Sequence, residues 1–354
     1  MILRNFLVTV FIISMSAGVF AQTQTMQIAG VARTYIVHAP TGLSNPPLVF
    51  NIHGFNMSAS SEQSYTQMDR IADRDKFIVV YPNALPNSSN QQSWDLTGPN
   101  DFAFILAIID TIDKKYHIDK SRIYSCGFSQ GGFMSFQLAC RYSDIFAAIA
   151  PTSGLISMGG SGACTLKRPV SMRLTFGTND VATPAQFMQS VATWLALDSC
   201  PTTPVITRPY PSTNPNSVVT RLYYGPCAQG TEVVADSIRT GQHEWPMNTN
   251  DRINNSEETW AFLKKFSLNG NTAISRNIFT AVPYCVSASY SSGIVRLQGT
   301  AEKCNVRVID TRGRVVAAAA ADQHQFAFKG KPGGVYIVMV SGNNIPGALK
   351  LVIP

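Results

Sequence analysis

The sequence predicts an α/β protein, a doubly wound, mostly parallel sheet with helices on both faces, followed by a small C-terminal β-sandwich. Two observations predict this. Between residues 31 and 266, apolar runs of strand length alternate with runs of helix length, an order typical of a parallel sheet covered on both faces. After residue 266 the chain carries only short strand-like runs separated by turn residues, which indicates a second fold.

The elements of the larger part follow one another in order. Strands are expected at residues 31–38, 48–53, 77–81, 122–126, 146–150, 172–176, 217–224 and 232–238, and helices at 61–74, 102–116, 130–142, 185–197 and 257–266. Asp101 precedes the helical run at 102–116 and is expected to cap its start. We therefore expect one domain over residues 22–266.

The end of the chain has a different pattern. Residues 267–272 have the composition of a linker. Residues 273–354 are expected to hold strands at 294–298, 306–310, 325–328 and 335–340, with turns at 311–313 and 331–334. The five consecutive alanines at 317–321 are expected to form a loop or the edge of a sheet.

The first 21 residues have the pattern of a signal peptide. Arg4 is followed by an apolar run at 6–13 and by small residues that end at Ala21. The apolar run is short for a membrane span, although an uncleaved anchor is the alternative. We expect export, so a secreted or cell-surface protein with no transmembrane segment in the mature chain.

Export makes disulfide bonds chemically possible, and the chain has seven cysteines. Their order suggests the pairs Cys140–Cys164, Cys200–Cys227 and Cys285–Cys304, although one sequence does not fix the connectivity. Cys126 is left over at the end of an apolar strand, so we expect a buried free thiol. None of the cysteines forms a CxxC pair and no histidines cluster with them, so no metal site is predicted.

Charge is unevenly distributed between the two parts. Residues 22–270 carry 18 Lys/Arg and 18 Asp/Glu, whereas residues 271–354 carry 9 and 3. The asymmetry indicates that the basic C-terminal part has partners of its own, such as an acidic polysaccharide or a cell surface. A solvated basic face is the alternative. No nucleic-acid partner is predicted, and a monomer is expected.

A GxSxG motif occupies residues 127–131, between the strand at 122–126 and the helix at 130–142. The motif alone is weak evidence, because small residues around a serine are common. A strand before it and a helix after it are the context of the nucleophile elbow in α/β-hydrolases, where a sharp turn lifts the serine above the sheet. The sequence therefore predicts Ser129 as a nucleophile.

A serine nucleophile needs a base, and the base needs a carboxylate to orient it. In this fold the order is serine, acid, histidine, and only His243 and His324 follow the nucleophile. Because His324 lies in the C-terminal part, His243 is the predicted base. Asp180, directly after the strand at 172–176, is the predicted acid. Asp198 and Asp236 are the competing candidates.

Ester hydrolysis also needs backbone donors for the oxyanion. We expect one from the amide of Gln130, directly after the nucleophile, and the other from Gly54 or Phe55, after the strand at 48–53. His53 stands at the same loop and is expected to organise it rather than to act as a second base. This chemistry requires no metal and no cofactor.

Several stretches together resemble the esterase family that contains polyhydroxybutyrate depolymerase-like proteins, feruloyl esterases and acetylxylan esterases, known as carbohydrate esterase family 1. The matching stretches are residues 33–40, 48–54, 77–82, 101–105, 127–134, 138–140, 177–180 and 243–246. The resemblance implies Ser129, Asp180 and His243 as the triad. It also suggests that Trp94 borders the substrate pocket, with a buried core aromatic as the alternative, and we add Trp245 and His53 to that expectation.

The C-terminal part resembles something else. Residues 305–314 and 333–340, with the end at 349–353, are similar to the C-terminal sorting domains of the type IX secretion system. This resemblance implies delivery across an outer membrane or retention at a cell surface.

Four functions are compatible with these residues. The first is hydrolysis of feruloyl or acetyl esters on plant cell-wall xylan, and the second is depolymerisation of a polyester such as polyhydroxybutyrate. The two use the same triad and differ in their acyl and alcohol pockets. A peptidase or acyltransferase on the same fold is the third, and a non-enzymatic binding module is the fourth.

Overall fold

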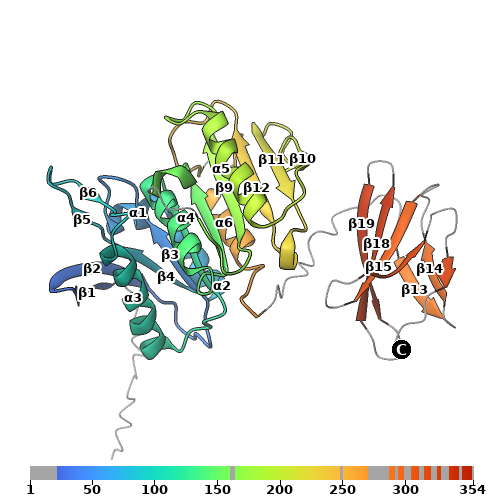
Figure 1. Ribbon diagram of the computed structural model, residues 1–354, viewed down its shortest axis with the longest axis horizontal. Helices are drawn as coiled ribbons and strands as arrows, with labels where there is room; N and C mark the ends of the chain where they lie inside the picture. The colour runs from blue at the N-terminus through green and yellow to red at the C-terminus, as the bar shows by residue number, and fades with distance from the viewer. Residues whose placement is uncertain are drawn as a thin grey trace, which may run out of the picture. The chain divides into compact units, whose positions relative to one another are not determined.

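The computed structural model describes residues 22–159, 164–247 and 250–269, and strands between residues 287 and 352. The chain forms two compact units, residues 1–272 and residues 273–354 (Figure 1). The predicted signal peptide lies outside the described residues. None of the helices in the described ranges combines the length and the apolar character needed to span a bilayer.

The first unit is built on a ten-stranded sheet with the order β1-β2-β4-β3-β7-β8-β9-β12-β11-β10. The strands β4, β3, β7, β8, β9 and β12 pair in parallel, and the strands at both edges are antiparallel. The mostly parallel sheet is as predicted. The bounds are β1 Gln22–Ile28, β2 Val31–His38, β3 Leu48–Ile52, β4 Ile78–Pro82, β7 Ile123–Phe128, β8 Ala148–Thr152, β9 Ser171–Gly177, β10 Val205–Thr207, β11 Val219–Tyr224 and β12 Val233–Ile238. A short hairpin, β5 Leu85–Pro86 and β6 Gln92–Ser93, stands apart.

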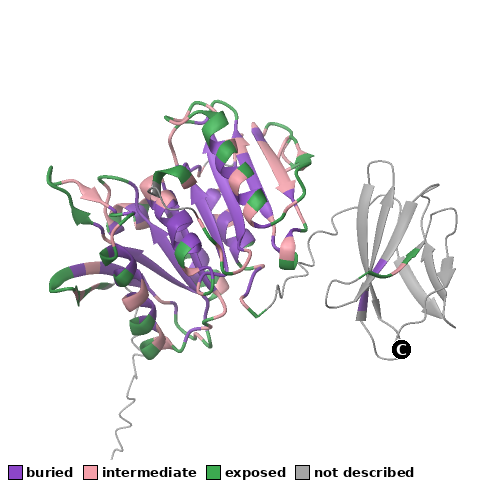
Figure 2. Cartoon of the chain, viewed as in Figure 1, coloured by how far each residue is buried: buried purple, intermediate pink, exposed green. Residues whose placement is uncertain are grey.

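Helices cover both faces of this sheet. The helices α3 Asn100–Tyr116, α4 Gln130–Tyr142 and α5 Pro184–Leu197 lie on one face, and α1 Ala59–Thr66, α2 Met68–Asp75 and α6 Asn255–Leu263 on the other. Successive residues of a strand point to opposite faces. Thus Phe50 of β3 belongs to the same buried hydrophobic cluster as Phe104 of α3, whereas its neighbour Val49 belongs to the cluster on the other face, with Ile71 of α2. The central strands are buried along their length (Figure 2).

Two local predictions are wrong. The expected helix at 61–74 is two helices, because Gln67 adopts a left-handed conformation (φ 51°) that ends α1. Asp101 does not cap α3: the capping position is Pro99, and no side chain bonds there. Asp101 instead forms a buried ion pair with Arg33 of β2 at 2.6 Å, since a buried guanidinium needs a charged partner.

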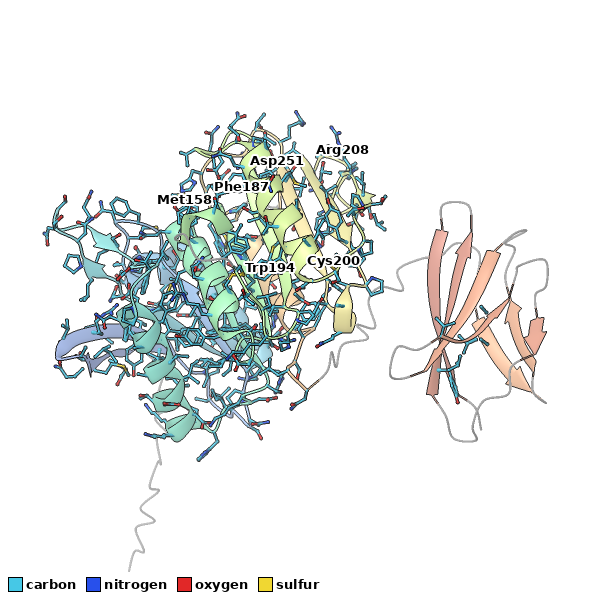
Figure 3. All side chains as sticks on the ribbon, in the orientation of Figure 1. Met158, Phe187, Trp194, Cys200, Arg208 and Asp251 are labelled. Carbon is cyan, nitrogen blue, oxygen red and sulfur yellow. A yellow bond between two sulfur atoms is a disulfide. The ribbon has the colours of Figure 1, made fainter. Side chains whose placement is uncertain are left out.

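The predicted disulfides Cys140–Cys164 and Cys200–Cys227 are both present, and Cys126 is a buried free thiol as predicted. Cys285 lies outside the described residues, so the third pair stays a prediction. Trp194 and Cys200 lie near the end of α5 (Figure 3).

The second unit holds two antiparallel sheets, with the orders β13-β14-β17 and β16-β15-β18-β19. Their strands are β13 Ser287–Ser291, β14 Ile294–Gln298, β15 Cys304–Asp310, β16 Val315–Ala319, β17 Gln325–Ala327, β18 Val335–Gly342 and β19 Ile345–Val352. Most of the alanine run falls in β16, which is an edge strand, one of the two predicted outcomes.

Candidate active site

Ser129 stands on the turn between β7 and α4. Its backbone has φ 55° and ψ −117°, outside the ordinary regions for a side-chain-bearing residue. The turn leaves no room for side chains on the two glycines of the motif. A Cβ atom on Gly131 would lie 1.9 Å from the carbonyl oxygen of Ile52, and one on Gly127 would lie 2.5 Å from the same atom. The two glycines of the motif are therefore required by close contact of backbones.

The structure brings the three predicted triad residues together. The Oγ atom of Ser129 lies 2.9 Å from Nε2 of His243, and Nδ1 of His243 lies 2.7 Å from Oδ1 of Asp180. The Asp180 side chain is fully buried, and the His243 side chain is 29% exposed. With its Nδ1–H donated to Asp180, the neutral imidazole presents Nε2 as an acceptor for the serine proton.

The acid and the base lie on two loops that are joined directly. Asp180 follows β9 and His243 follows β12, which are neighbouring parallel strands. The N–H of Asn179 donates to the carbonyl of Gly241 at 2.8 Å. A Cβ on Gly177 would lie 2.2 Å from that same carbonyl oxygen. Close backbone contact, which only glycine permits, thus sets the distance between the two loops.

Asn255, at the start of α6, forms hydrogen bonds with several segments that lead to the site. Its fully buried side chain accepts hydrogen bonds from Nη1 of Arg173 at 2.9 Å and Oγ1 of Thr175 at 3.1 Å. Its Nδ2 donates to Oγ1 of Thr152 at 2.8 Å, and its backbone N–H donates to the carbonyl of Pro246 at 2.8 Å. The side chain and the backbone N–H of Asn255 therefore connect β8, β9 and the loop after β12 that carries His243.

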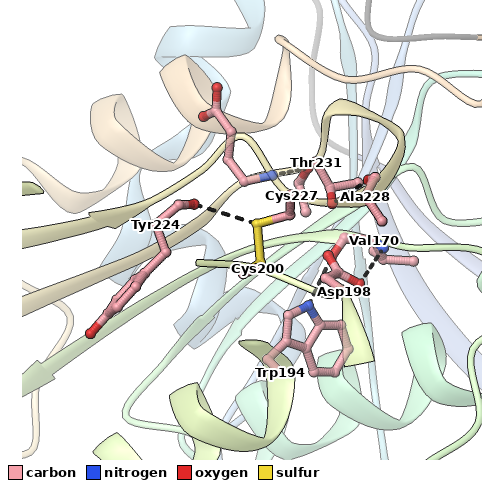
Figure 4. The surroundings of a disulfide bond; sticks show 10 residues. Val170, Trp194, Asp198, Cys200, Tyr224, Cys227, Ala228 and Thr231 are labelled. Carbon is pink, nitrogen blue, oxygen red and sulfur yellow. Dashed lines mark hydrogen bonds between the residues drawn. A yellow bond between two sulfur atoms is a disulfide. The ribbon is translucent and has the colours of Figure 1, made fainter. Parts of the chain in front are cut away.

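The two competing acids lie elsewhere. Asp198 is buried next to the Cys200–Cys227 disulfide and accepts a hydrogen bond from the N–H of Val170 (Figure 4); burial raises its pKa to about 7. Asp236 is fully buried in β12. Burial opposes its charge, but the guanidinium groups of Arg221 and Arg173 hold its pKa below the usual value. Neither carboxylate bonds to the histidine.

Two of the predicted oxyanion residues, Gln130 and Gly54, lie beside the nucleophile. Gln130 is the first residue of α4, where backbone N–H groups have no partner within the helix. A Cβ atom on Gly54 would lie 3.3 Å from Cβ of Ser129, so the loop after β3 passes directly beside the nucleophile. The Gln130 side chain accepts a hydrogen bond from the N–H of Trp94 at 3.0 Å. The side chain of Phe55 is 45% exposed.

His53 organises this loop, as expected. Its Nε2 accepts the N–H of Ala84 at 3.0 Å, so the proton is on Nδ1, which donates to the carbonyl of Gly54 at 2.7 Å. Burial lowers the pKa of His53 to about 4. The imidazole is therefore neutral and fixed at ordinary pH.

The expectation that Trp94, Trp245 and His53 border the substrate pocket is corrected by their burial. They are 3%, 2% and 0% exposed, which leaves almost no surface for a ligand. The indole N–H of Trp94 donates to the carbonyl of His53 at 2.9 Å, and that of Trp245 donates to Ser256 at 2.9 Å. Their roles are structural, because buried polar groups of this kind bond to the protein.

Sequence reasoning missed Ser153, whose hydroxyl donates to the second carboxylate oxygen of Asp180 at 2.6 Å. Its place directly after the strand β8, at the edge where the triad lies, was the available signal. Within the described ranges no group of three or more His, Cys, Asp or Glu side chains is arranged to hold a metal ion.

The strand order, the turn at Ser129 and the hydrogen-bonded Ser–His–Asp arrangement define an α/β-hydrolase. Residues 33–182 match the family described as esterase PHB depolymerase, and the predicted resemblance to this esterase family is confirmed.

Several known proteins with a similar sequence or a similar fold are named as esterases. A bifunctional acetylxylan esterase/xylanase of Neocallimastix patriciarum is 30% identical over 251 residues, 70% of this chain and 35% of that protein. Feruloyl esterase B of Thermothelomyces thermophilus is 35% identical over 136 residues, 36% of this chain and 46% of that protein. The acetyl xylan esterase of Aspergillus awamori shares the fold, with a TM-score of 0.56 and 16% identity over 69% of this chain and 99% of that one. The chain thus spans a third to a half of the length of these two sequence relatives.

Proposed function

We propose that the chain is a serine carboxylic ester hydrolase in which Ser129 forms an acyl-enzyme. The observation that carries this proposal is the continuous hydrogen-bonded series from Ser129 through His243 to Asp180. The sequence similarity to esterases supports the same reaction type.

The first half of the reaction transfers the acyl group to the enzyme. Oγ of Ser129 attacks the ester carbonyl carbon while Nε2 of His243 takes the hydroxyl proton, and Asp180 stabilises the resulting imidazolium. The N–H groups of Gln130 and of Gly54 or Phe55 donate to the oxyanion. When the tetrahedral intermediate collapses, the C–O bond to the alcohol breaks and His243 gives the alcohol its proton.

The second half releases the acid. His243 removes a proton from a water molecule, and the oxygen of that water attacks the acyl carbon. Collapse of the second intermediate breaks the bond to Oγ of Ser129, which recovers its proton from His243. A water molecule is consumed, and an acid and an alcohol are formed.

We propose feruloyl or acetyl esters of plant cell-wall xylan as the substrate, because the two sequence relatives are named for such esters. Exposed apolar side chains support an apolar acyl group. Phe55, Met158 and Val181 are 45%, 53% and 84% exposed and lie on the segments after β3, β8 and β9, at the edge of the sheet that carries the triad.

A polyester of the polyhydroxybutyrate type is the alternative substrate, because the matching family is described by that polymer. Parallel assays with methyl ferulate, acetylated xylan and polyhydroxybutyrate granules separate the two. Release of ferulate or acetate with inert granules supports the first substrate class, and the reverse result overturns it.

The nucleophile is tested with p-nitrophenyl acetate. Ser129→Ala should reduce hydrolysis to near background while circular dichroism shows a retained fold. Ser199→Ala is a matched control, because Ser199 is an exposed serine that also has a positive φ (51°), and it should keep full activity. Undiminished turnover by Ser129→Ala would overturn the proposed reaction.

We also propose that the protein is exported and acts as a monomer, and that its basic C-terminal unit attaches it to an acidic polysaccharide or a cell surface. The two disulfides support an oxidising location. Salt-dependent retention of the full chain on glucuronoxylan, lost when residues 273–354 are removed, would support the attachment. Equal retention of both forms would overturn it.

A further inference from the structure

The two carboxylate oxygens of Asp180 have different partners. Oδ1 lies 2.7 Å from Nδ1 of His243, and Oδ2 accepts the hydroxyl proton of Ser153 at 2.6 Å. The carboxylate itself is fully buried. A buried charge is stable only when protein donors replace water, so the hydroxyl of Ser153 supplies part of what the solvent would otherwise supply.

Ser153 is held in an unusual backbone conformation. It follows β8 directly, its φ is 53°, and it is 3% exposed. Its N–H donates to the carbonyl of Thr175 in β9 at 2.8 Å. A residue with a side chain at positive φ is strained, and such strain persists where the surrounding structure fixes it, commonly beside a functional site. The strain here directs the hydroxyl at Asp180.

We propose that Ser153 is a positioning residue that fixes the orientation of the Asp180 carboxylate toward His243. The proposal rests on the proposed function, because it assigns Asp180 as the triad acid. With Oδ2 held by Ser153, rotation about the Cβ–Cγ bond of Asp180 is blocked, and Oδ1 stays in line with Nδ1 of His243. The hydroxyl of Ser153 bonds to Asp180, whereas the hydroxyl of Ser129 bonds to His243. The effect of Ser153 is therefore on the chemical step and not on binding.

The proposal is tested by a pair of substitutions that separate the hydroxyl from the backbone strain. Ser153→Ala removes the hydroxyl and keeps the strain, whereas Ser153→Gly removes both, because glycine adopts positive φ freely. Both variants should lose kcat by about ten- to a hundredfold, the size expected for a hydrogen bond to a charged group, with KM for p-nitrophenyl acetate unchanged. Ser199→Ala and Ser199→Gly serve as the matched pair at a positive φ outside the site and should keep wild-type kcat.

Activity is compared at a temperature where unfolding curves show every variant fully folded. A wild-type kcat in Ser153→Gly would overturn the proposal, because that variant lacks the hydroxyl and would show that kcat does not depend on it. A loss that appears only in KM would overturn it as well. Ser129→Ala is assayed in parallel. If that variant is inactive while both Ser153 variants are fully active, only the role of Ser153 fails, whereas turnover in Ser129→Ala shows that the proposed function itself is wrong.

Discussion

Arg173 and Asp236 form a fully buried ion pair beneath the candidate site, with Nε of Arg173 2.8 Å from Oδ2 of Asp236. Arg221 of β11 binds the same carboxylate with two further hydrogen bonds. The pair joins β9 to β12, the two strands whose ends carry the acid and the base. One carboxylate therefore stabilises the sheet while another, Asp180, contacts the histidine.

The two carboxylates should respond differently to the same substitution. Asp236→Asn leaves the buried guanidinium of Arg173 without its counter-charge and should lower the free energy of unfolding by about 3–5 kcal/mol, with kcat per folded molecule nearly unchanged. Asp180→Asn should lower kcat by about ten-thousandfold, because the imidazole loses its charged partner and its correct tautomer. Urea unfolding and kcat are measured on both variants. If the two effects were exchanged, the assignment of the acid would be wrong.

His53 should make stability depend on pH. Burial lowers the pKa of His53 in the folded protein to about 4, whereas an unfolded histidine has a pKa of about 6.5. Above pH 6.5 the imidazole is neutral in both states. As the pH falls from about 6.5 to about 4, only the unfolded chain takes up the proton, so the free energy of unfolding falls by about 3 kcal/mol.

This dependence is measured by urea unfolding at several pH values on the wild type and on His53→Gln. The variant should show a smaller loss of stability between neutral pH and pH 4, since it has no proton to take up at this position. An identical pH dependence in both proteins would contradict the assigned cause.

The Cys200–Cys227 disulfide closes a loop of 27 residues. Replacing both cysteines by alanine should lower the free energy of unfolding by about 3 kcal/mol, because the unfolded chain regains the entropy that the bridge removes. The bridge links the segment after α5 to the segment before β12. Cys227 therefore lies near the beginning of β12, whereas the triad lies at the ends of the strands. Urea unfolding should therefore shift while kcat stays unchanged, and a shift in kcat with constant stability would contradict this placement.

Much of the fold and of the candidate site could be predicted because the signals are local. Buried strands such as β3 and β7 are mostly apolar runs, and the glycines at 127 and 131 mark the turn at Ser129 in the sequence itself. His243 followed from the scarcity of histidines after the nucleophile, and Asp180 from its place at a strand end.

The features that could not be predicted depend on contacts between distant residues. The edge strands β1 and β10 are polar or very short, and they form by pairing with a neighbour. Asp101 was expected to cap a helix because it stands directly before a helical run. Its actual partner, Arg33, lies far away in the sequence, and only the fold brings the two side chains together. The burial of Trp94 and Trp245, and the hydrogen bond from Ser153, likewise appear only when the chain is folded.

The position of Asn255 in the chain determines when its contacts with the site can form. It bonds to Thr152, 103 positions earlier in the chain, and Thr152 in turn accepts the backbone N–H of Ser129. A ribosome that has made the nucleophile, and even the acid and the base, has not yet made this residue. The hydrogen bonds of Asn255 to β8 and β9 can therefore form only after all three triad residues have been synthesised.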